Sequence, residues 1–218
     1  MTKKNQRGVL ITLEGTEGSG KTTLIRNLAL RLEQAGAPVI QTREPGGSPL
    51  AERIRELVLK IPMSSRTELF LYEAARSEHL AYLIRPALTE GKIVLCDRFT
   101  DSTLAYQAGA RGLPWKEVQT LNKIATAGIE PDLTILVDID PAVGLERARD
   151  PNRFEAEGIG FQKKVRSGYL RAKRENPKRW FILKAQNRTP EELTAMAYRE
   201  IEKRFGKRFG KMKSHRNS

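Results

Sequence analysis

The sequence contains very few of the residues that build disulfide frameworks and metal cages. Its only cysteine is Cys96, and its only histidines are His79 and His215. A single cysteine excludes an intramolecular disulfide, and so few scattered side chains do not make the Cys/His cluster of a zinc site. We therefore expect a protein that relies on neither device, as is usual for cytoplasmic proteins.

Long apolar segments are missing as well. No run approaches the roughly 18 apolar residues that suggest a membrane-spanning helix. The basic residues 1–8 are followed by an apolar run that Glu14 interrupts before a glycine-rich loop, which is not the pattern of a signal peptide. The expectation is a cytoplasmic protein without a membrane-spanning segment.

Acidic residues are outnumbered, with 26 Asp and Glu against 39 Lys and Arg, and the formal net charge is +13. Three basic residues lie in 1–8 and seven in 203–218, and neither stretch contains an acid. Such charge runs are typical of solvated termini. We expect residues 206–218 to form a basic, disordered tail. Nucleic acid is not the expected partner, because the end of the chain offers only Phe205 and Phe209 for stacking on bases.

Short β-rich apolar runs alternate with long stretches of helical periodicity. The predicted strands cover residues 9–14, 39–42, 93–97, 133–138 and 180–183, and the predicted helices cover 21–34, 50–59, 67–90, 115–127, 142–149, 161–176 and 190–205. This alternation favours a parallel sheet with helices on both faces. A chain of 218 residues suits one core, so we predict a single α/β domain over residues 1–205.

Several helix ends are marked by local chemistry. Thr189-Pro190-Glu191-Glu192 has the spacing of a capping box with proline at the first helical position, and Asp140 precedes Pro141 in the same way. Gly36 and Gly91 stand where helices are expected to end.

A phosphate-binding loop is the strongest motif in the chain. Residues 15–22 match G-x-x-x-x-G-K-[ST], directly after a predicted strand and at the start of a predicted helix. In such loops the backbone N–H groups and the helix N-terminus face phosphate oxygens. Lys21 then supplies a charge at the β- and γ-phosphates, and the Thr22 hydroxyl can bind Mg²⁺. The residues predicted to bind ATP are Gly15, Thr16, Glu17, Gly18, Ser19, Gly20, Lys21, Thr22 and Thr23.

This loop alone does not separate kinases from GTPases and ATPases. Guanine-specific switches carry N-K-x-D, and the nearest match, residues 122–125, reads Asn-Lys-Ile-Ala and lacks the aspartate. The sequence therefore argues against a regulatory GTPase.

A second anion site is predicted where the strand 93–97 ends in Asp97-Arg98. The carboxyl edge of a parallel sheet is where such folds bind ligands. Asp97 can hold the Mg²⁺ shell together with Thr22, partly through water, and the planar fork of Arg98 suits a phosphate. The alternative is a structural ion pair at the edge of the sheet.

A cationic segment at about 147–160 has the composition of a hinged lid, because it combines arginines with Pro151, Gly158 and Gly160. Transfer to a phosphate needs no strong base, since the acceptor oxygen is already anionic. Catalysis must instead neutralise charge and exclude water. We predict that the arginines of this segment, Arg147, Arg149 and Arg153, do this; a solvated helix end is the alternative.

Taken together, these and other motifs resemble those of bacterial thymidylate kinases over about residues 8–205. The matching segments are 15–22, Thr42-Arg43-Glu44-Pro45-Gly46-Gly47, Glu73-Ala74-Ala75-Arg76, Asp97-Arg98-Phe99, Ala105-Tyr106-Gln107, Arg153-Phe154-Glu155 and 165–170. The resemblance implies a P-loop NTPase-type three-layer sandwich with a five-stranded parallel sheet, like other nucleoside monophosphate kinases. It also implies a mobile lid, a homodimer, and phosphorylation of dTMP to dTDP by Mg·ATP. The catalytic residues implied are Lys21, Glu17, Arg98, Arg149 and Arg153.

The same resemblance implies a dTMP pocket. Arg98 grips the phosphate, Glu17 lies near the sugar, Tyr72 stacks on the base, and Arg76 bonds the thymine edge. A donor there would disfavour cytosine, whose N4 is also a donor. The full implied set is Glu44, Pro45, Tyr72, Arg76, Arg98, Ser102, Thr103, Tyr106 and Gln107. The peptide bond between Glu44 and Pro45 is expected to be cis, as in relatives.

Three positions vary within the family. Many relatives have Phe where this chain has Tyr72, and Tyr where it has Phe99. Gly18 stands where some relatives carry an arginine, and with Arg149 and Arg153 this resembles the type whose catalytic arginine is on the lid.

Two alternatives remain open. One is a different P-loop kinase, of another nucleoside monophosphate or of a deoxynucleoside; the pair Arg98 and Arg76 favours a monophosphate. The other is a nucleotide-dependent nucleic-acid-binding module that uses the basic ends. The tolerance of the pocket for dUMP is also open, since a methyl group contributes only about 1–3 kcal/mol of discrimination.

Overall fold

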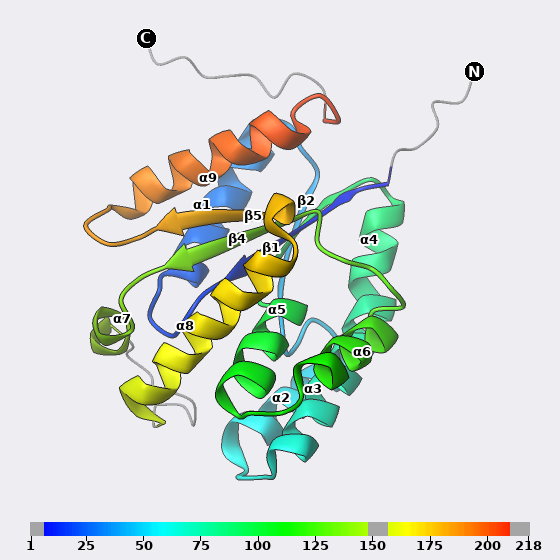
Figure 1. The fold of residues 1–218 in the computed structure, drawn as a ribbon. Coiled ribbons are helices and arrows are strands. Elements are labelled where there is room, and N and C mark those ends of the chain that lie inside the picture. The colour runs from blue at the N-terminus through cyan, green and yellow to red at the C-terminus, as the bar shows by residue number, and fades with distance from the viewer. Residues whose placement is uncertain (1–6, 148–156, 210–218) are drawn as a thin grey trace.

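A five-stranded parallel sheet forms the centre of the molecule (Figure 1). The computed structural model describes residues 7–147 and 157–209. Its strands are β1 (Val9–Glu14), β2 (Val39–Arg43), β3 (Ile93–Asp97), β4 (Leu133–Asp138) and β5 (Trp180–Lys184), in the order β2-β3-β1-β4-β5. All neighbouring pairs are parallel. The predicted strands are confirmed, each to within one residue at either end.

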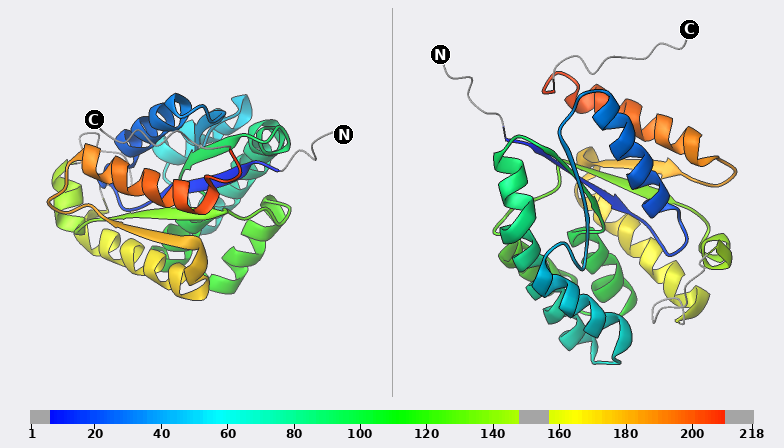
Figure 2. Two further views of the ribbon diagram at one scale, coloured as in Figure 1. Left: turned by 90° about the horizontal axis from the view of Figure 1, so that it is seen from above. Right: turned by 180° about the vertical axis from the view of Figure 1, so that it is seen from behind.

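The sheet separates two different layers of side chains. Val9, Ile11 and Leu13 of β1 pack against α1 (Lys21–Gln34) and α9 (Pro190–Phe205) in one apolar core. Leu10 belongs to a separate cluster, as expected because successive residues of a strand point to opposite faces. Figure 2 shows α1 and α9 on one side of the sheet and α8 (Gly158–Glu175) on the other. The predicted parallel sheet with helices on both faces is confirmed.

Two buried threonines of neighbouring strands belong to one hydrogen-bonded group. The hydroxyl groups of Thr12 and Thr134 lie 3.0 Å apart across the β1–β4 pair, and Thr134 donates to Asp101 over 3.1 Å. Arg179 completes the group by binding the Asp101 carboxylate with two N–H groups. A buried polar group is stable in a core only when it is paired in this way.

A further group of helices lies on the α8 side of the sheet, where Leu88 packs with Leu10. It contains α2 (Pro49–Lys60), α3 (Ser65–His79), α4 (Arg85–Thr89) and α6 (Trp115–Ala125). The single helix predicted over 67–90 is continuous, but it contains a π-helical turn, η1 (Leu80–Ile84), between α3 and α4. Such turns inside α-helices often occur at functional sites.

One helical segment was not predicted. Residues Thr100–Thr103 form α5, and Leu104–Ala110 continue it as a second π-helix, η2. Most of its residues are buried on every side, so there is no polar face and no helical periodicity to detect. It packs closely on α8, where a Cβ atom on Gly168 would lie 2.7 Å from Ala105 Cα.

The predicted helix ends are confirmed. Gly36 and Gly91 have φ values of 84° and 78°, in the left-handed region that favours glycine at a helix end. Thr189 and Glu192 form the reciprocal capping box of α9. The Asp140 carboxylate accepts from the backbone of Ala142 at the start of α7 (Pro141–Arg147). The remaining short element is a 3₁₀ turn, η3 (Pro177–Arg179).

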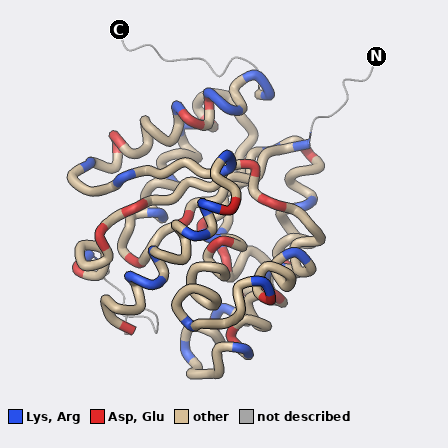
Figure 3. The backbone as a smooth tube through the Cα atoms, viewed as in Figure 1, with Lys and Arg blue, Asp and Glu red and all other residues tan. Residues whose placement is uncertain are grey.

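Charge is mixed over the body of the protein. Basic and acidic residues are interspersed along the described backbone (Figure 3). Phe205 and Phe209 pack against the core cluster of α1 and α9, whereas residues 210–218 lie outside the described part. None of the described helices is long and apolar enough to cross a membrane.

Candidate active site

The phosphate-binding loop joins β1 to α1 at the carboxyl edge of the sheet. Gly15 and Gly20 have φ values of 154° and 92°, and a Cβ atom on Gly15 would lie 2.7 Å from the Val137 carbonyl. Lys21 is buried, and its ammonium donates to the carbonyls of Gly15 and Thr16 over 3.1 and 2.9 Å. Burial, with a contribution from nearby Arg98, lowers the pKa of Lys21 to about 8.

Thr22 and Asp97 meet beside this loop, as predicted. The Thr22 hydroxyl donates to Asp97 Oδ2 over 3.3 Å. The other carboxylate oxygen, Asp97 Oδ1, is buried without a hydrogen-bond partner among the described residues. An unpaired carboxylate oxygen next to a hydroxyl suits a hard divalent cation such as Mg²⁺. The described residues contain no group of three His, Cys, Asp or Glu that could hold a metal alone. Water and phosphate would therefore complete its shell.

Arg98 connects the phosphate loop to a second pocket. Its backbone has φ 68°, an uncommon value for a residue other than glycine. Its guanidinium donates to the Gly15 carbonyl over 3.2 Å and to Glu17 over 2.7 Å, and Tyr106 donates to the same Glu17 oxygen over 2.9 Å. Burial opposes ionisation of Glu17, but the charges of Arg98 and Lys21 outweigh it and lower its pKa.

Glu14 lies beneath this arginine and was not predicted as a site residue. It is fully buried, and accepts from the Phe99 backbone over 2.8 Å, from Ser102 over 2.6 Å and from Tyr169 over 3.0 Å. Burial, followed by repulsion from Asp101, raises the pKa of Glu14 to about 7. Ser102 and Tyr169 also contact Arg98, so Glu14 supports the arginine through its neighbours.

Arg76 is held by a buried ring of acceptors at the other end of the pocket. Its guanidinium donates to Glu44 over 2.8 Å, to Glu73 over 2.9 Å and to Asn122 over 2.7 Å. A further N–H group bonds the Phe99 carbonyl over 3.2 Å. Burial disfavours the charge, but Glu44 and Glu73 more than compensate and raise the pKa of Arg76. The expected cis peptide bond between Glu44 and Pro45 is present.

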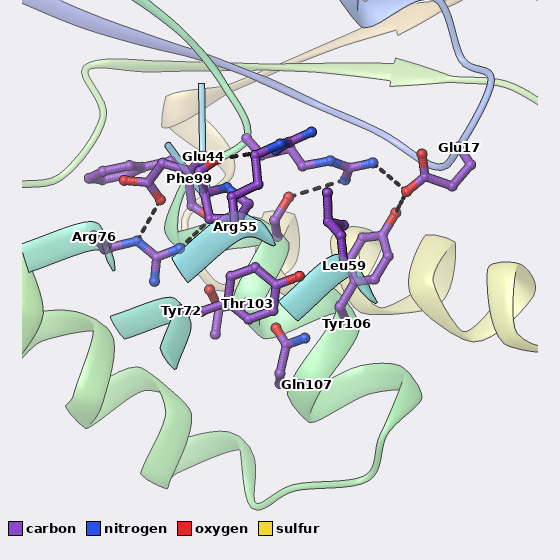
Figure 4. A pocket seen from close by; sticks show the side chains of 13 residues that line it. Glu17, Glu44, Arg55, Leu59, Tyr72, Arg76, Phe99, Thr103, Tyr106 and Gln107 are labelled. Atoms are coloured by element: carbon purple, nitrogen blue, oxygen red, sulfur yellow. Dashed lines mark hydrogen bonds and ion pairs between the residues drawn. The ribbon is translucent and has the colours of Figure 1, made fainter. Parts of the chain in front are cut away.

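The structure brings all nine predicted acceptor-site residues together around one pocket (Figure 4). Tyr72 and Arg76 come from one side of α3, and Figure 4 shows the Gln107 amide directed toward the Tyr72 ring. Three lining residues, Arg55, Leu59 and Phe99, were not among those predicted. The complete lining consists of Glu17, Glu44, Pro45, Arg55, Leu59, Tyr72, Arg76, Arg98, Phe99, Ser102, Thr103, Tyr106 and Gln107.

Arg55 brings another positive charge into this pocket from α2. It donates to the Pro45 carbonyl over 3.1 Å. Burial, followed by repulsion from Arg43, lowers its pKa. Arg55 lies on a helix whose opposite face is in solvent. In the sequence it resembles many surface arginines, and no motif distinguishes it.

A separate pocket lies against the other side of the phosphate loop. It is lined by Ser19, Gly20, Thr23, Leu24, Arg147, Ala185, Arg188, Pro190 and Leu193. Of these, Arg188 comes from the connection between β5 and α9, which carries no recognisable motif. Its proximity follows from topology, because that connection leaves the same edge of the parallel sheet as the phosphate loop.

The structure describes only part of the predicted lid. Arg149 and Arg153 lie outside the described residues. The segments on either side approach Glu17 of the phosphate loop. On α7, a Cβ atom on Gly144 would lie 2.5 Å from the Glu17 carbonyl, and Gln162 of α8 accepts from the Glu17 backbone over 3.5 Å.

Two adjoining pockets therefore share one sheet edge. A phosphate loop serves the first, and a guanidinium that touches that loop lines the second. This arrangement defines the class of P-loop phosphotransferases with separate donor and acceptor sites.

Comparison with known proteins gives the family. The family model described as thymidylate kinase matches residues 13–197, and the chain belongs to this family. A thymidylate kinase of Hahella chejuensis (strain KCTC 2396) is 46% identical over 198 residues, which cover 88% of this chain and 95% of the relative. The thymidylate kinases of Paraburkholderia xenovorans (strain LB400) and Pseudomonas putida (strain GB-1) are each 50% identical over 184 residues, covering 81% and 82% of this chain and 89% and 88% of theirs. The resemblance and the α/β fold expected from the sequence are confirmed.

Proposed function

We propose that this enzyme transfers the γ-phosphoryl group of Mg·ATP to the phosphate of dTMP, giving ADP and dTDP. The observation that carries this proposal is the position of Arg98, which contacts the Gly15 carbonyl and lines the acceptor pocket. A phosphate bound by Arg98 would lie next to the phosphate loop. The acceptor oxygen is already anionic, so charge neutralisation and alignment suffice for catalysis.

The donor half of this proposal rests on the phosphate loop. The backbone of Gly15, Thr16, Glu17, Gly18, Ser19 and Gly20 binds the ATP phosphates, with Lys21, Thr22 and Thr23 at the start of α1. Thr22 and Asp97 would hold Mg²⁺, partly through water, and a bound ion would supply positive charge to the donor phosphates. The pocket beside Arg147 and Arg188 takes the ATP nucleoside, because it adjoins Ser19 and Gly20 of the loop.

The acceptor half rests on the pocket of Figure 4. Arg98, assisted by Arg55, binds the dTMP phosphate, and Glu17 with Tyr106 faces the deoxyribose. Tyr72 stacks on the base, and Arg76 with Gln107 reads its edge. Ser102 and Thr103 close the pocket, while Glu44 beside Pro45 fixes the Arg76 guanidinium. Bidentate arginine contacts to phosphate are strong and geometrically specific, which supports Arg98 as the acceptor anchor.

Other parts of the proposal extend beyond the described site. We assign Arg149 and Arg153 to charge stabilisation during transfer, from a lid at about 147–160. Residues 1–205 form one kinase domain, and 206–218 are a basic tail with no role in turnover. The enzyme acts in the cytoplasm, with ATP and dTMP as its partners and without nucleic acid.

We further propose that the enzyme is a homodimer. Neighbouring helices expose large apolar side chains, namely Leu57 of α2 at 43%, Phe70 of α3 at 51% and Ile124 of α6 at 70%. A second copy of the chain covering these helices would remove them from water. Sedimentation equilibrium should give twice the chain mass, and a monomer at micromolar concentration would contradict the dimer without affecting the reaction.

The first experiment measures ADP release from Mg·ATP with dTMP, dUMP, dCMP, dGMP, UMP and thymidine as acceptors. We expect dTMP to have the highest kcat/KM, and thymidine, which lacks the anion for Arg98, to be inactive. Preferred turnover of another monophosphate would preserve the roles of the loop and Arg98 but overturn the assignment of Tyr72, Arg76 and Gln107. Absence of turnover with every acceptor would overturn the proposed function.

A further inference from the structure

The amide of Gln107 has a fixed partner behind the acceptor pocket. Gln107 lies on η2 and is only 2% exposed. Its Nε2 donates over 2.8 Å to the carboxylate of Glu68, which is 1% exposed and lies in the first turn of α3. Glu68 does not line the pocket, and neither the motifs nor the family match gives it a role.

This hydrogen bond determines which end of the amide faces the ligand. An ionised carboxylate only accepts hydrogen bonds, whereas an amide has one accepting and one donating end. The NH₂ group of Gln107 must therefore face Glu68, and its carbonyl oxygen must point elsewhere. Among the described residues, none donates a hydrogen bond to that oxygen, and Gln107 lines the pocket. The acceptor end of the amide is thus presented to the bound base.

Arg111 pairs with the Glu68 carboxylate. Its Nε lies 3.5 Å from the Glu68 carboxylate, and another of its N–H groups is paired with Glu157. The Arg111 side chain is 16% exposed, so its charge acts on Glu68 in a largely dehydrated setting. Arg111 therefore contacts Glu68, and Glu68 in turn accepts a hydrogen bond from the Gln107 amide.

The pocket therefore offers a donor and an acceptor with fixed identities. Arg76 can only donate, because a guanidinium has no acceptor. Its Nη2 carries two hydrogens, and the Phe99 carbonyl accepts one of them. Gln107 accepts, because Glu68 occupies its NH₂ group. Thymine and uracil present an O4 acceptor next to an N3–H donor, which complement this pair. Cytosine presents the reverse, an N4 donor next to an N3 acceptor.

We propose that Glu68 is a specificity-determining positioning residue, which excludes cytosine by locking the Gln107 amide with its oxygen toward the base. This inference rests on the proposed function, because it assumes that the pocket holds a pyrimidine. Glu68 itself touches neither substrate nor reacting atoms. Its effect is on the choice of base and is transmitted by one hydrogen bond.

The test is Glu68→Gln, assayed with dTMP, dUMP and dCMP. An amide at position 68 can either donate or accept, so the Gln107 amide is free to turn its NH₂ group toward the pocket. We expect the ratio of kcat/KM for dTMP to that for dCMP to fall about 10- to 100-fold, the range of one hydrogen bond to a charged or mismatched partner. The ratio for dTMP to dUMP should stay within about threefold, because both bases carry N3–H and O4.

Two further variants make the result specific. Glu117→Gln removes a carboxylate of the same helical layer that pairs with Arg66 over 3.2 Å at the surface, and it should leave all ratios unchanged. The double variant Glu68→Gln/Gln107→Glu reverses donor and acceptor, so that a carboxylate oxygen again faces the base. It should regain at least part of the discrimination against dCMP that Glu68→Gln loses.

The outcomes separate this inference from the proposed function. Equal losses for dTMP and dCMP in Glu68→Gln, with an unchanged ratio, would show a merely structural role and overturn the inference. If Glu68→Gln does not fold, the double variant decides, and loss of discrimination there would likewise overturn it. Failure of the unmodified enzyme to phosphorylate dTMP would instead overturn the proposed function.

Discussion

At the scale of single residues, the site depends on buried carboxylates whose partners come from distant parts of the chain. Glu14 bonds Ser102 and Tyr169, which lie 88 and 155 residues further along. Glu68 bonds Gln107 across 39 residues. A motif identifies residues such as Lys21 by their spacing in the sequence. The hydrogen bonds of these buried carboxylates form only when the chain folds, and no motif marks them. For this reason the lining of the pocket was predicted well, and the residues behind it were not.

Glu14 gives a prediction for stability against pH. Its native pKa of about 7 exceeds the ordinary value of 4.5, so the native state binds this proton more tightly than the unfolded chain does. The resulting stabilisation is complete below about pH 4.5 and is lost as the pH rises through about 7. Glu14→Gln removes this dependence while preserving the shape of the side chain. Relative to the unmodified protein, the variant should gain on the order of 3 kcal/mol between pH 4.5 and pH 8.

Urea unfolding across this pH range measures the effect. Glu56→Gln, which alters an exposed carboxylate, is the control and should follow the unmodified protein at every pH. Parallel curves for Glu14→Gln and the unmodified protein would show that the native pKa of Glu14 is ordinary.

At the scale of elements, the strands and most helices could be predicted because the apolar residues of each follow one simple pattern. The buried strands are short apolar runs, and the capping box of α9 is a local pattern. The segment α5–η2 was missed because it is enclosed by α6 and α8 and therefore lacks a polar face. It nevertheless supplies Ser102, Thr103, Tyr106 and Gln107 to the pocket. The least predictable element thus carries four of the predicted site residues.

The contact between η2 and α8 gives a prediction at this scale. Gly168→Ala would place a methyl group 2.7 Å from Ala105 Cα and 3.0 Å from its carbonyl, so one helix must move. Overpacking of this kind destabilises by about 1–3 kcal/mol, more than the roughly 1 kcal/mol that alanine gains over glycine in a helix. Because Tyr106 follows Ala105, we also expect a higher KM for dTMP.

The matched control is Gly160→Ala in the same helix, where an added Cβ meets nothing within 4 Å. That variant should be as stable as the unmodified enzyme, or slightly more stable, in thermal unfolding. Equal behaviour of the two variants would mean that the close approach of α8 to η2 is not needed.

At the scale of the whole molecule, the net charge of +13 proved a poor guide to function, whereas the alternation of strands and helices was a good one. Parallel connections bring residues from the ends of β1, β3 and β4 and from the β5–α9 connection to the same edge. Asp97 and the phosphate loop could be placed together on that basis alone. The distance between Arg98 and Gly15, in contrast, depends on a left-handed backbone at Arg98 that no pattern predicts.

The end of the chain gives a prediction at this scale. Phe209 packs against the core of α1 and α9, although it lies within the predicted tail. Truncation after Phe209 should therefore leave both the thermal midpoint and turnover unchanged. Truncation after Phe205 removes the Phe209 contact and should lower stability by about 1 kcal/mol, with kcat preserved. Loss of kcat in the shorter protein would give the tail a catalytic role.

The two faces of the central sheet differ in polarity, and this difference affects which substitutions the protein tolerates during evolution. Residues 9, 11 and 13 face an entirely apolar layer, where side chains of similar volume replace one another with little loss. Thr12 and Glu14, on the opposite face, belong to hydrogen-bond groups that reach Asp101 and Ser102 beside the pocket. Neutral drift should therefore accumulate on the side of α1 and α9. On the other side a substitution at Thr12 or Glu14 changes substrate recognition as well as packing, so these strand residues evolve together with the site.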